Sequence, residues 1–202
     1  MYSVHPSIAY IQAIVKNLPQ KTGKSLDEWL VILEQSGLKN QREQRLWLKN
    51  TFGVGDTTAG LLAEYASGNG IEREEKEYLD NAHRYVEDMF AGPKEPLRPL
   101  YESLLRWALS LYPAIKISPC KTIVPFYRNH VIAQIKPSTR TRIDFGLSLR
   151  DLGGLSSNRL IETGGLTKGD RITHRIAIHS SADIDEDLAF WLKRAYELDS
   201  GS

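Results

Sequence analysis

A basic segment, residues 136–142, is the part of this sequence best suited to bind an anion. Side chains of a β-strand alternate between its two faces, so Arg140 and Arg142 are expected on one side, with Asp144 next on that side. Arg175 joins them if its own strand is adjacent. Guanidinium groups form bidentate contacts with phosphate or carboxylate groups. The candidate anion-binding residues of this surface are Lys136, Arg140, Arg142 and Arg175. The alternative is a solvated sheet face on which an arginine pairs with Asp144.

The charge of the chain is unevenly distributed, although its 26 basic and 25 acidic residues leave a net charge of only +1. Residues 114–178 carry 11 basic and 4 acidic residues, whereas residues 71–113 and 179–202 are acidic. A local excess of one sign governs the potential that a charged ligand meets. The basic block therefore favours a polyanion such as nucleic acid as partner. The acidic segments could instead fold over the basic block and neutralise it.

A second candidate anion site lies at residues 52–59, with the sequence Phe-Gly-Val-Gly-Asp-Thr-Thr-Ala. It resembles the hairpin of helix-hairpin-helix DNA-binding motifs, in which two glycines flank an apolar residue. Gly53 and Gly55 allow a tight turn, and the N–H groups at the start of the next helix can face a phosphate. Asp56 departs from this pattern, since its carboxylate would repel a phosphate. The alternative is a simple turn between two helices.

A glycine-rich loop that contains Gly164, Gly165 and Gly169 precedes the last predicted strand. Such a loop could fold over a ligand at the edge of the sheet. This gives the alternative function, a small-molecule-binding protein or enzyme with a pocket between the basic sheet and the loop from Gly164 to Gly169. A connector without a ligand is the other interpretation.

Residues that could support catalysis lack the necessary spacing. Cys120 is the only cysteine, so neither a disulfide framework nor a multi-cysteine zinc site is expected. His174 and His179 are an odd number of positions apart and would face opposite sides of one strand, which makes them a poor metal pair. The sequence therefore predicts no catalytic residue, no metal and no cofactor, and it favours a protein that is not an enzyme.

The elements that must position these residues fall into two parts. Apolar residues at helical spacing predict four short helices before residue 68. Ser25 and Glu28 form a capping box, and Asn40 and Asp56 are the expected N-caps of the third and fourth helices. The segment 67–70 is the best domain boundary. We expect three parts, namely a helical domain at residues 1–68, a linker helix within residues 69–96 and an α+β domain at residues 97–202.

After Pro113 the apolar pattern changes from helical to alternating, which is typical of strands. Three runs with short connections, then a long loop and a fourth run at residues 174–178, predict a mainly antiparallel sheet. An amphipathic helix precedes these runs, and a closing helix with Asp183 as its N-cap follows them. The expected fold class is therefore α+β, with a small all-helical N-terminal domain followed by a mainly antiparallel sheet that has helices on one face.

Two stretches resemble families of unknown function. The sequence Lys-Thr-Gly-Lys-Ser-Leu-Asp-Glu-Trp at residues 21–29, with residues 37–39, 47–49 and 53–55, resembles a bacterial domain of unknown function. Residues 121–147, with residues 173–176 and the closing helix, resemble a second one. The resemblance implies a bacterial cytosolic protein with these two domains and brings no catalytic residues. The second domain also occurs in bacterial proteins labelled as predicted transport or endonuclease-associated proteins, which by analogy favours nucleic acid.

These observations lead to one functional hypothesis and two alternatives. We expect a non-catalytic two-domain protein that contacts nucleic acid or another polyanion. The first alternative is the small-ligand pocket described above, and the second is a protein-interaction module that uses the acidic helix at residues 72–90. No run of about 18 apolar residues is present, so no membrane partner is expected. The sequence shows no secretory signal, and a reduced cytoplasm is the expected location.

Overall fold

The computed structural model describes residues 2–68, 72 and 74–200. It separates into two compact units, a helical unit at residues 4–78 and a sheet unit made of residues 79–202 together with the first three residues. The predicted boundary segment 67–70 lies partly outside the described residues. The domain boundaries predicted at residues 68 and 96 remain predictions, because they concern whether each part folds on its own. None of the described helices has the length and apolar character needed to cross a membrane.

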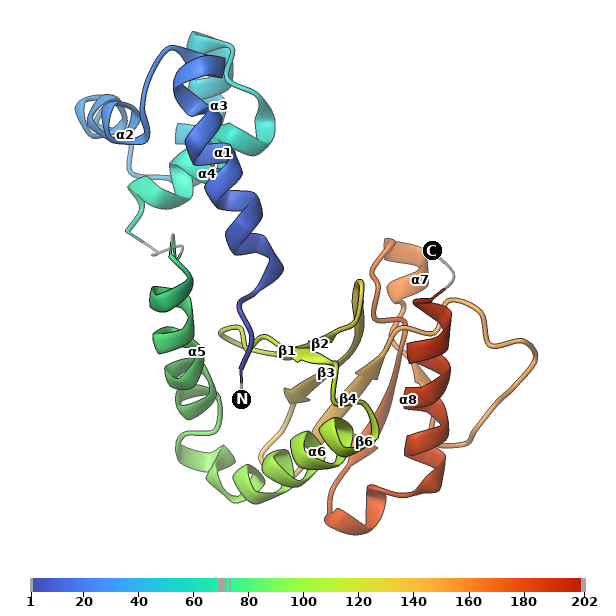
Figure 1. The fold of residues 1–202 in the computed structure, drawn as a ribbon. Helices are drawn as coiled ribbons and strands as arrows, with labels where there is room; N and C mark the ends of the chain where they lie inside the picture. Colours follow the sequence, from blue (N-terminus) through green and yellow to red (C-terminus); the bar gives the residue numbers. More distant parts are fainter. Residues whose placement is uncertain (1, 69–71, 73, 201–202) are drawn as a thin grey trace. The chain divides into compact units, whose positions relative to one another are not determined.

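The helical unit contains the four predicted helices (Figure 1, blue to cyan). They are α1 (Pro6–Thr22), α2 (Leu26–Gln35), α3 (Gln41–Phe52) and α4 (Asp56–Ala66). Apolar side chains from all four helices form one core, because each helix places its apolar positions on one face. The most deeply buried members are Leu18, Trp29, Leu33, Leu48, Ala59 and Leu62.

The ends of these helices show how local sequence sets their limits. The capping box predicted at Ser25 is confirmed, since Ser25 N donates to Glu28 Oε2 at 2.7 Å and Glu28 N donates to Ser25 Oγ at 3.3 Å. Asn40 caps α3 by accepting a hydrogen bond from Arg42 N at 2.8 Å. The N-cap predicted at Asp56 is wrong, because Gly55 occupies that position and Asp56 is the first residue of α4.

Helix α5 (Glu75–Met89) continues the chain from one unit into the other and corresponds to the predicted linker helix. The short helix η1 (Gly92–Leu97) and helix α6 (Arg98–Leu111) follow it. Val86, Met89 and Phe90 belong to the core of the sheet unit. The start of the chain is held there too, since Ser3 N donates to Ile117 O at 2.7 Å.

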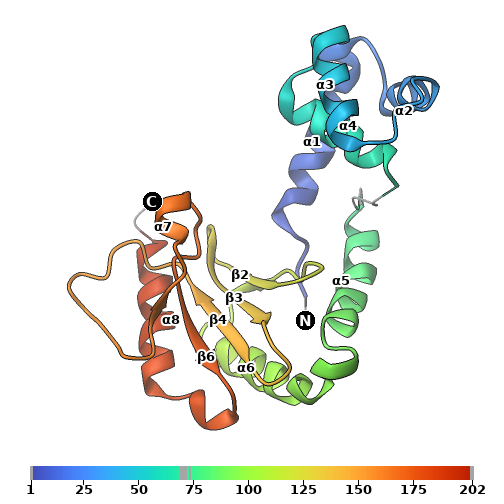
Figure 2. The ribbon, with the colours of Figure 1, turned by 180° about the vertical axis from the view of Figure 1, so that it is seen from behind.

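The sheet has six strands in the order β1-β2-β3-β4-β6-β5, and every neighbouring pair is antiparallel. The strands are β1 (Lys116–Ile117), β2 (Val124–Tyr127), β3 (Val131–Pro137), β4 (Ile143–Leu147), β5 (Ile161–Glu162) and β6 (His174–Ile178). Figure 2 shows β3, β4 and β6 side by side, as this order requires. The antiparallel arrangement is confirmed, and two short edge strands are added to the four that the sequence predicts.

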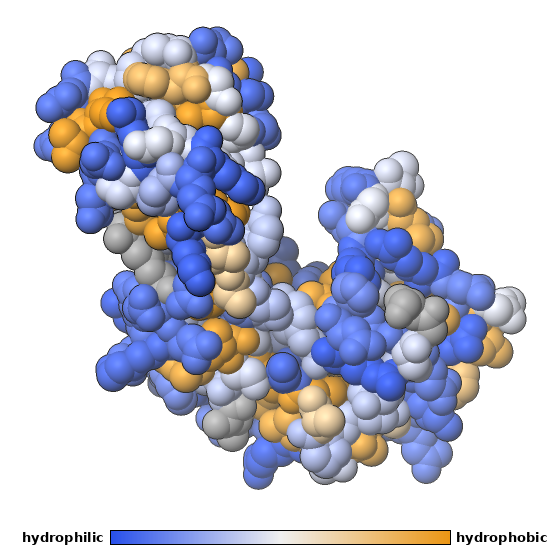
Figure 3. Space-filling model, turned by 45° about the horizontal axis from the view of Figure 1, so that its top comes forward, coloured by the Kyte–Doolittle hydropathy of each residue, from blue (hydrophilic) through white to orange (hydrophobic). Residues whose placement is uncertain are grey.

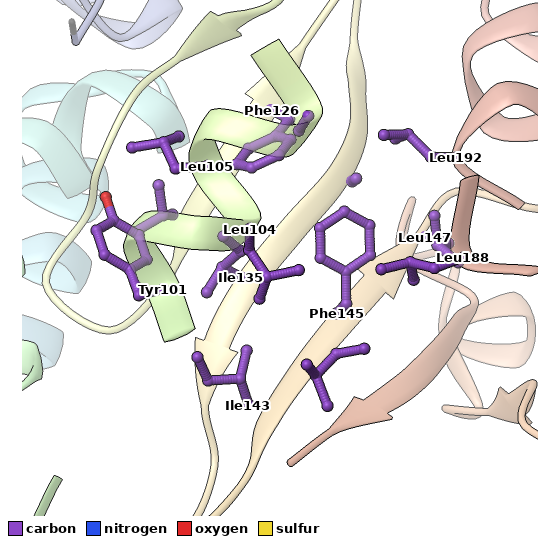
Figure 4. Packing of buried hydrophobic residues seen from close by; sticks show 14 of the residues in the cluster. Tyr101, Leu104, Leu105, Phe126, Ile135, Ile143, Phe145, Leu147, Leu188 and Leu192 are labelled. Atoms are coloured by element: carbon purple, nitrogen blue, oxygen red, sulfur yellow. The ribbon is translucent and has the colours of Figure 1, made fainter. Parts of the chain in front are cut away.

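One face of the sheet is covered by α6 and by the closing helix α8 (Glu186–Leu198). Figure 4 shows leucines from both helices among the apolar side chains of the strands, such as Phe126 and Phe145. These leucines are Leu104 and Leu105 from α6 and Leu188 and Leu192 from α8. All of them are buried, and the removal of such apolar side chains from water stabilises this unit. The predicted fold class, with helices on one face of the sheet, is therefore confirmed.

The start of α8 differs from the prediction. Asp185 is its N-cap and accepts a hydrogen bond from Leu188 N at 3.0 Å. Asp183, the predicted cap, instead ends the short helix η2 (Ser181–Asp183) and accepts a hydrogen bond from Ser180 N at 2.9 Å. Both Asp183 and Asp185 have a side chain suited to an N-cap. Because Asp183 is taken up by η2, the helix begins after Asp185.

Candidate anion-binding site on the sheet

The face of the sheet opposite α6 and α8 carries polar side chains. Strand pairing places Lys136 of β3 opposite Asp144 of β4, and Gly146 of β4 opposite Arg175 of β6. Because directly opposite residues share a face, these positions form one polar surface. The condition stated for Arg175 is met, because β6 is the neighbour of β4 in the sheet.

Asp144 is the centre of this surface, and its side chain is only 14% exposed. Its Oδ1 atom lies 3.0 Å from Arg175 Nη1 and 2.9 Å from Arg142 Nε. Its Oδ2 atom accepts a hydrogen bond from Ser138 Oγ at 2.6 Å. One carboxylate therefore holds two guanidinium groups, which leaves an excess of positive charge. This geometry agrees with both interpretations of Arg142. It forms the ion pair with Asp144 that a solvated face would have, and it also lies beside Arg175, as in an anion site.

The turn between β3 and β4 positions Arg140 and Arg142. β3 ends at Pro137 and β4 begins at Ile143, so the strand alternation predicted for these two arginines is wrong. Ser138 N donates to Arg142 O at 3.1 Å and closes the turn. Arg140 lies exposed within the turn. Neither Arg140 nor Lys136 has a side-chain hydrogen bond or ion pair to any residue that the structure describes.

A hollow of about 510 Å³ lies over this polar surface, and we call it the sheet hollow. Its lining comprises Val131, Gln134, Lys136, Asp144, Gly146, Thr163, Asp170, Arg171, Ile172 and Arg175. The segment 163–172, which contains the short helix α7 (Gly165–Lys168), supplies the wall that does not come from the sheet. This segment includes the glycine-rich loop, and it does approach the basic sheet face.

Two glycines allow this close approach. A Cβ atom at Gly146 would lie 2.7 Å from Ile172 Cγ2, so Ile172 rests directly on the sheet backbone there. A Cβ atom at Gly165 would lie 2.2 Å from the backbone oxygen of Ile172. Any other residue at Gly165 would push the wall out of place, because a backbone oxygen cannot move alone.

A second hollow, of about 690 Å³, lies beside the turn, and we call it the turn hollow. Its lining comprises Asp88, Met89, Ala91, Pro93, Lys94, Lys121, Thr122, Lys136, Pro137, Ser138 and Arg140. Lys136 lines both hollows. Lys94 Nζ donates to Pro137 O at 2.7 Å and thereby fixes η1 to the end of β3. Sequence reasoning missed Lys94 and Lys121, because no local pattern indicates that they approach the turn.

The glycine hairpin belongs to the helical unit. Gly53 ends α3 with φ +66°, and Gly55 precedes α4. Asp56 forms ion pairs with Arg45 and, at 2.7 Å, with Lys49. Hydrogen bonds from these two side chains lower the pKa of Asp56 to about 2. The start of α4 therefore carries an ionised carboxylate, and an anion site at Gly53 and Gly55 remains a prediction.

The cysteine and histidine side chains considered for catalysis do not line the sheet hollow. His174 is buried on the core side, 2.9 Å from Thr173 Oγ1, and burial lowers its pKa. His130 Nδ1 lies 2.9 Å from Asp199 Oδ1. Cys120 Sγ lies 3.7 Å from Ser118 O. Among the residues with described positions, no three His, Cys, Asp or Glu side chains are grouped to hold a metal ion.

Each of the two units is matched by a protein-family model. A family model described as a domain of unknown function (DUF5655) matches residues 86–199, which is more than half of the chain. The chain belongs to this family. A second model, described as a domain of unknown function (DUF4287), matches residues 11–68. The predicted pair of domains of unknown function is thus confirmed. Neither the curated proteins nor the solved structures contain a match to the chain.

Proposed function

We propose that the sheet unit binds a polyanion through the sheet hollow, with the phosphates of nucleic acid as the ligand. The observation that carries the proposal is the cluster in which Asp144 holds both Arg142 and Arg175 beside Lys136. A guanidinium has five N–H donors. Among the nitrogens of the Arg175 guanidinium, only Nη1 donates a hydrogen bond within the described chain. Fixed guanidinium groups with free donors are well suited to phosphate oxygens.

The lining of the sheet hollow supports a charged ligand. Figure 3 shows one face of the molecule, on which hydrophilic residues cover most of the surface and hydrophobic residues form smaller patches. The side chains of Lys136, Arg171 and Arg175 line the sheet hollow together with Asp144 and Asp170. Because Asp144 is already engaged by two arginines, the free charge of the lining is positive. A cytoplasmic location would give such a surface access to nucleic acid.

The proposed role is binding without catalysis. His130 is engaged by Asp199, and His174 faces the core rather than the hollow. No side chain lining the sheet hollow is a histidine or a cysteine. The groups that line the hollow can hold a phosphate, but none of them is placed as a nucleophile beside a base.

A second candidate ligand is a small anionic molecule. The observation that favours it is the wall at residues 163–172, which turns an open sheet face into a hollow of about 510 Å³. Small-molecule sites have volumes of roughly 300–1,000 Å³. Such a ligand would be retained by the basic residues of the lining, Lys136, Arg171 and Arg175, and would bind with a weaker dependence on salt than a polyanion.

The test is binding of a fluorescently labelled oligonucleotide, measured by anisotropy, to the wild type and to the double variant Arg142→Ala/Arg175→Ala. Arg175 lines the sheet hollow and Arg142 lies beside it on Asp144, so removing both should reduce the slope of log affinity against log salt by up to about two units. Arg106→Ala is the matched control, because Arg106 is exposed on α6, lines neither hollow and has no ion pair with Asp144 in the described chain. Equal slopes for the double variant and the wild type would contradict the proposal.

A further inference from the structure

The turn hollow has the composition of a second phosphate site. Four of its lining side chains are basic, namely Lys94, Lys121, Lys136 and Arg140, and Asp88 is its one acidic lining residue. Thr122 adds a hydroxyl group, which can donate to a phosphate oxygen, whereas the hydroxyl proton of Ser138 is already donated to Asp144. This hollow lies outside the sheet hollow that carries the proposed function.

Two connections join the hollows. Lys136 lines both of them. Ser138 lines the turn hollow, and its hydroxyl donates to Asp144, which lines the sheet hollow. The two hollows therefore adjoin at Lys136, and each has further basic side chains in its lining.

The walls of both hollows also include apolar side chains. Val131 and Ile172 line the sheet hollow, and Met89, Pro93 and Pro137 line the turn hollow. These side chains are aliphatic and offer no aromatic ring for stacking, but apolar surface beside cations can contact the exposed bases of a single strand while the cations contact its phosphates. In a duplex the bases are paired and stacked, so their faces cannot contact such walls.

We infer that the two hollows form one continuous track for the backbone of a single nucleic-acid strand. This inference rests on the proposed function, because it extends the ligand of the sheet hollow into the turn hollow. It assigns Lys121 and Arg140 to phosphate contacts that a short ligand confined to the sheet hollow does not make. Binding must therefore depend on the length of the strand.

The experiment uses the full chain and labelled oligothymidylates of increasing length, up to about 16 nucleotides. The variant Lys121→Ala/Arg140→Ala should lower the affinity for the longest strand by about tenfold at low salt and reduce the salt slope by up to about two units. It should leave the affinity for thymidine monophosphate unchanged. Arg106→Ala is again the control. Circular dichroism verifies that each variant is folded.

The outcomes separate the inference from the proposed function. If Arg142→Ala/Arg175→Ala weakens binding and Lys121→Ala/Arg140→Ala does not, the track is wrong and the sheet hollow alone binds the ligand. If a duplex of equal length binds more tightly than the single strand, the assignment to one strand is overturned. If the wild type binds no strand in a salt-dependent manner, the proposed function fails together with the inference.

Discussion

Arg175 Nη1 lies 3.0 Å from Asp144 Oδ1, across the neighbouring antiparallel strands β6 and β4. Arg142 reaches the same oxygen from the turn, at 2.9 Å. The carboxylate thus offsets the repulsion between two guanidinium groups and fixes their positions. The positions of Arg142 and Arg175 in the proposed binding surface depend on this arrangement.

Removing the carboxylate should destabilise the sheet unit in a way that an anion can reverse. Asp144→Ala leaves two partly buried cations without their partner, and we expect a loss of about 1–3 kcal/mol in the free energy of unfolding. Inorganic phosphate should raise the melting temperature of the variant more than that of the wild type, because it can take the place of the carboxylate. Thermal melts with and without phosphate measure this. An identical phosphate effect on both proteins would show that the arginines do not form an anion site.

The wall of the sheet hollow depends on Gly165. Gly165→Ala would place Cβ against Ile172 O, and we expect the segment 163–172 to shift, with a cost of about 1–3 kcal/mol in stability. Hydrogen exchange of this segment should become faster. Gly60→Ala is the control, because a Cβ there meets its nearest neighbour at an ordinary 3.8 Å. Unchanged exchange in Gly165→Ala would show that the wall does not depend on this contact.

Asp199 should make the stability depend on acid pH. Burial alone would raise its pKa, but hydrogen bonds from Asn129 N, His130 N and His130 Nδ1 hold the pKa below its usual value. The folded-state pKa is lower than the unfolded one, so the stabilisation is complete above the unfolded pKa of about 3.9. It is lost as the pH falls through the folded pKa.

We therefore expect Asp199→Asn to lower the free energy of unfolding at neutral pH by about 1–3 kcal/mol. On acidification, the free energy of unfolding should fall less in this variant than in the wild type. Denaturant titrations at several pH values measure both effects. The control is Asp170→Asn, since Asp170 has no side-chain partner within the described chain. Parallel pH profiles for Asp199→Asn and the wild type would exclude this role.

The glycine hairpin of the helical unit is tested through Asp56. Asp56→Asn removes the carboxylate from the start of α4 and releases Arg45 and Lys49. If the N–H groups near Gly53 and Gly55 contact phosphate, the variant should bind DNA several-fold more tightly at low salt. Asp27→Asn changes the net charge equally from an exposed site on α2. Equal gains in both variants would assign the effect to net charge and exclude the hairpin.

Local features of the fold could be predicted from the sequence, because they depend on residues only a few positions apart. The caps at Ser25 and Asn40 are of this kind. The caps predicted at Asp56 and Asp183 are nevertheless wrong, because the N-caps lie one residue earlier and two residues later, at Gly55 and Asp185. Features that depend on register or on distant segments could not. The pairing of Gly146 with Arg175 could only be stated conditionally, since it requires β4 and β6 to be neighbours. Lys94 reaches the turn from 43 residues away, and no local pattern marks it.

The central claim is that the sheet unit binds a polyanion through phosphate contacts. The most direct measurement is the affinity of the wild-type chain for a labelled single-stranded oligonucleotide over a range of salt concentrations. We predict a linear fall of log affinity with log salt, with a slope of about −0.7 for each phosphate contact. A wild-type protein that shows no salt-sensitive binding at low ionic strength would contradict the claim.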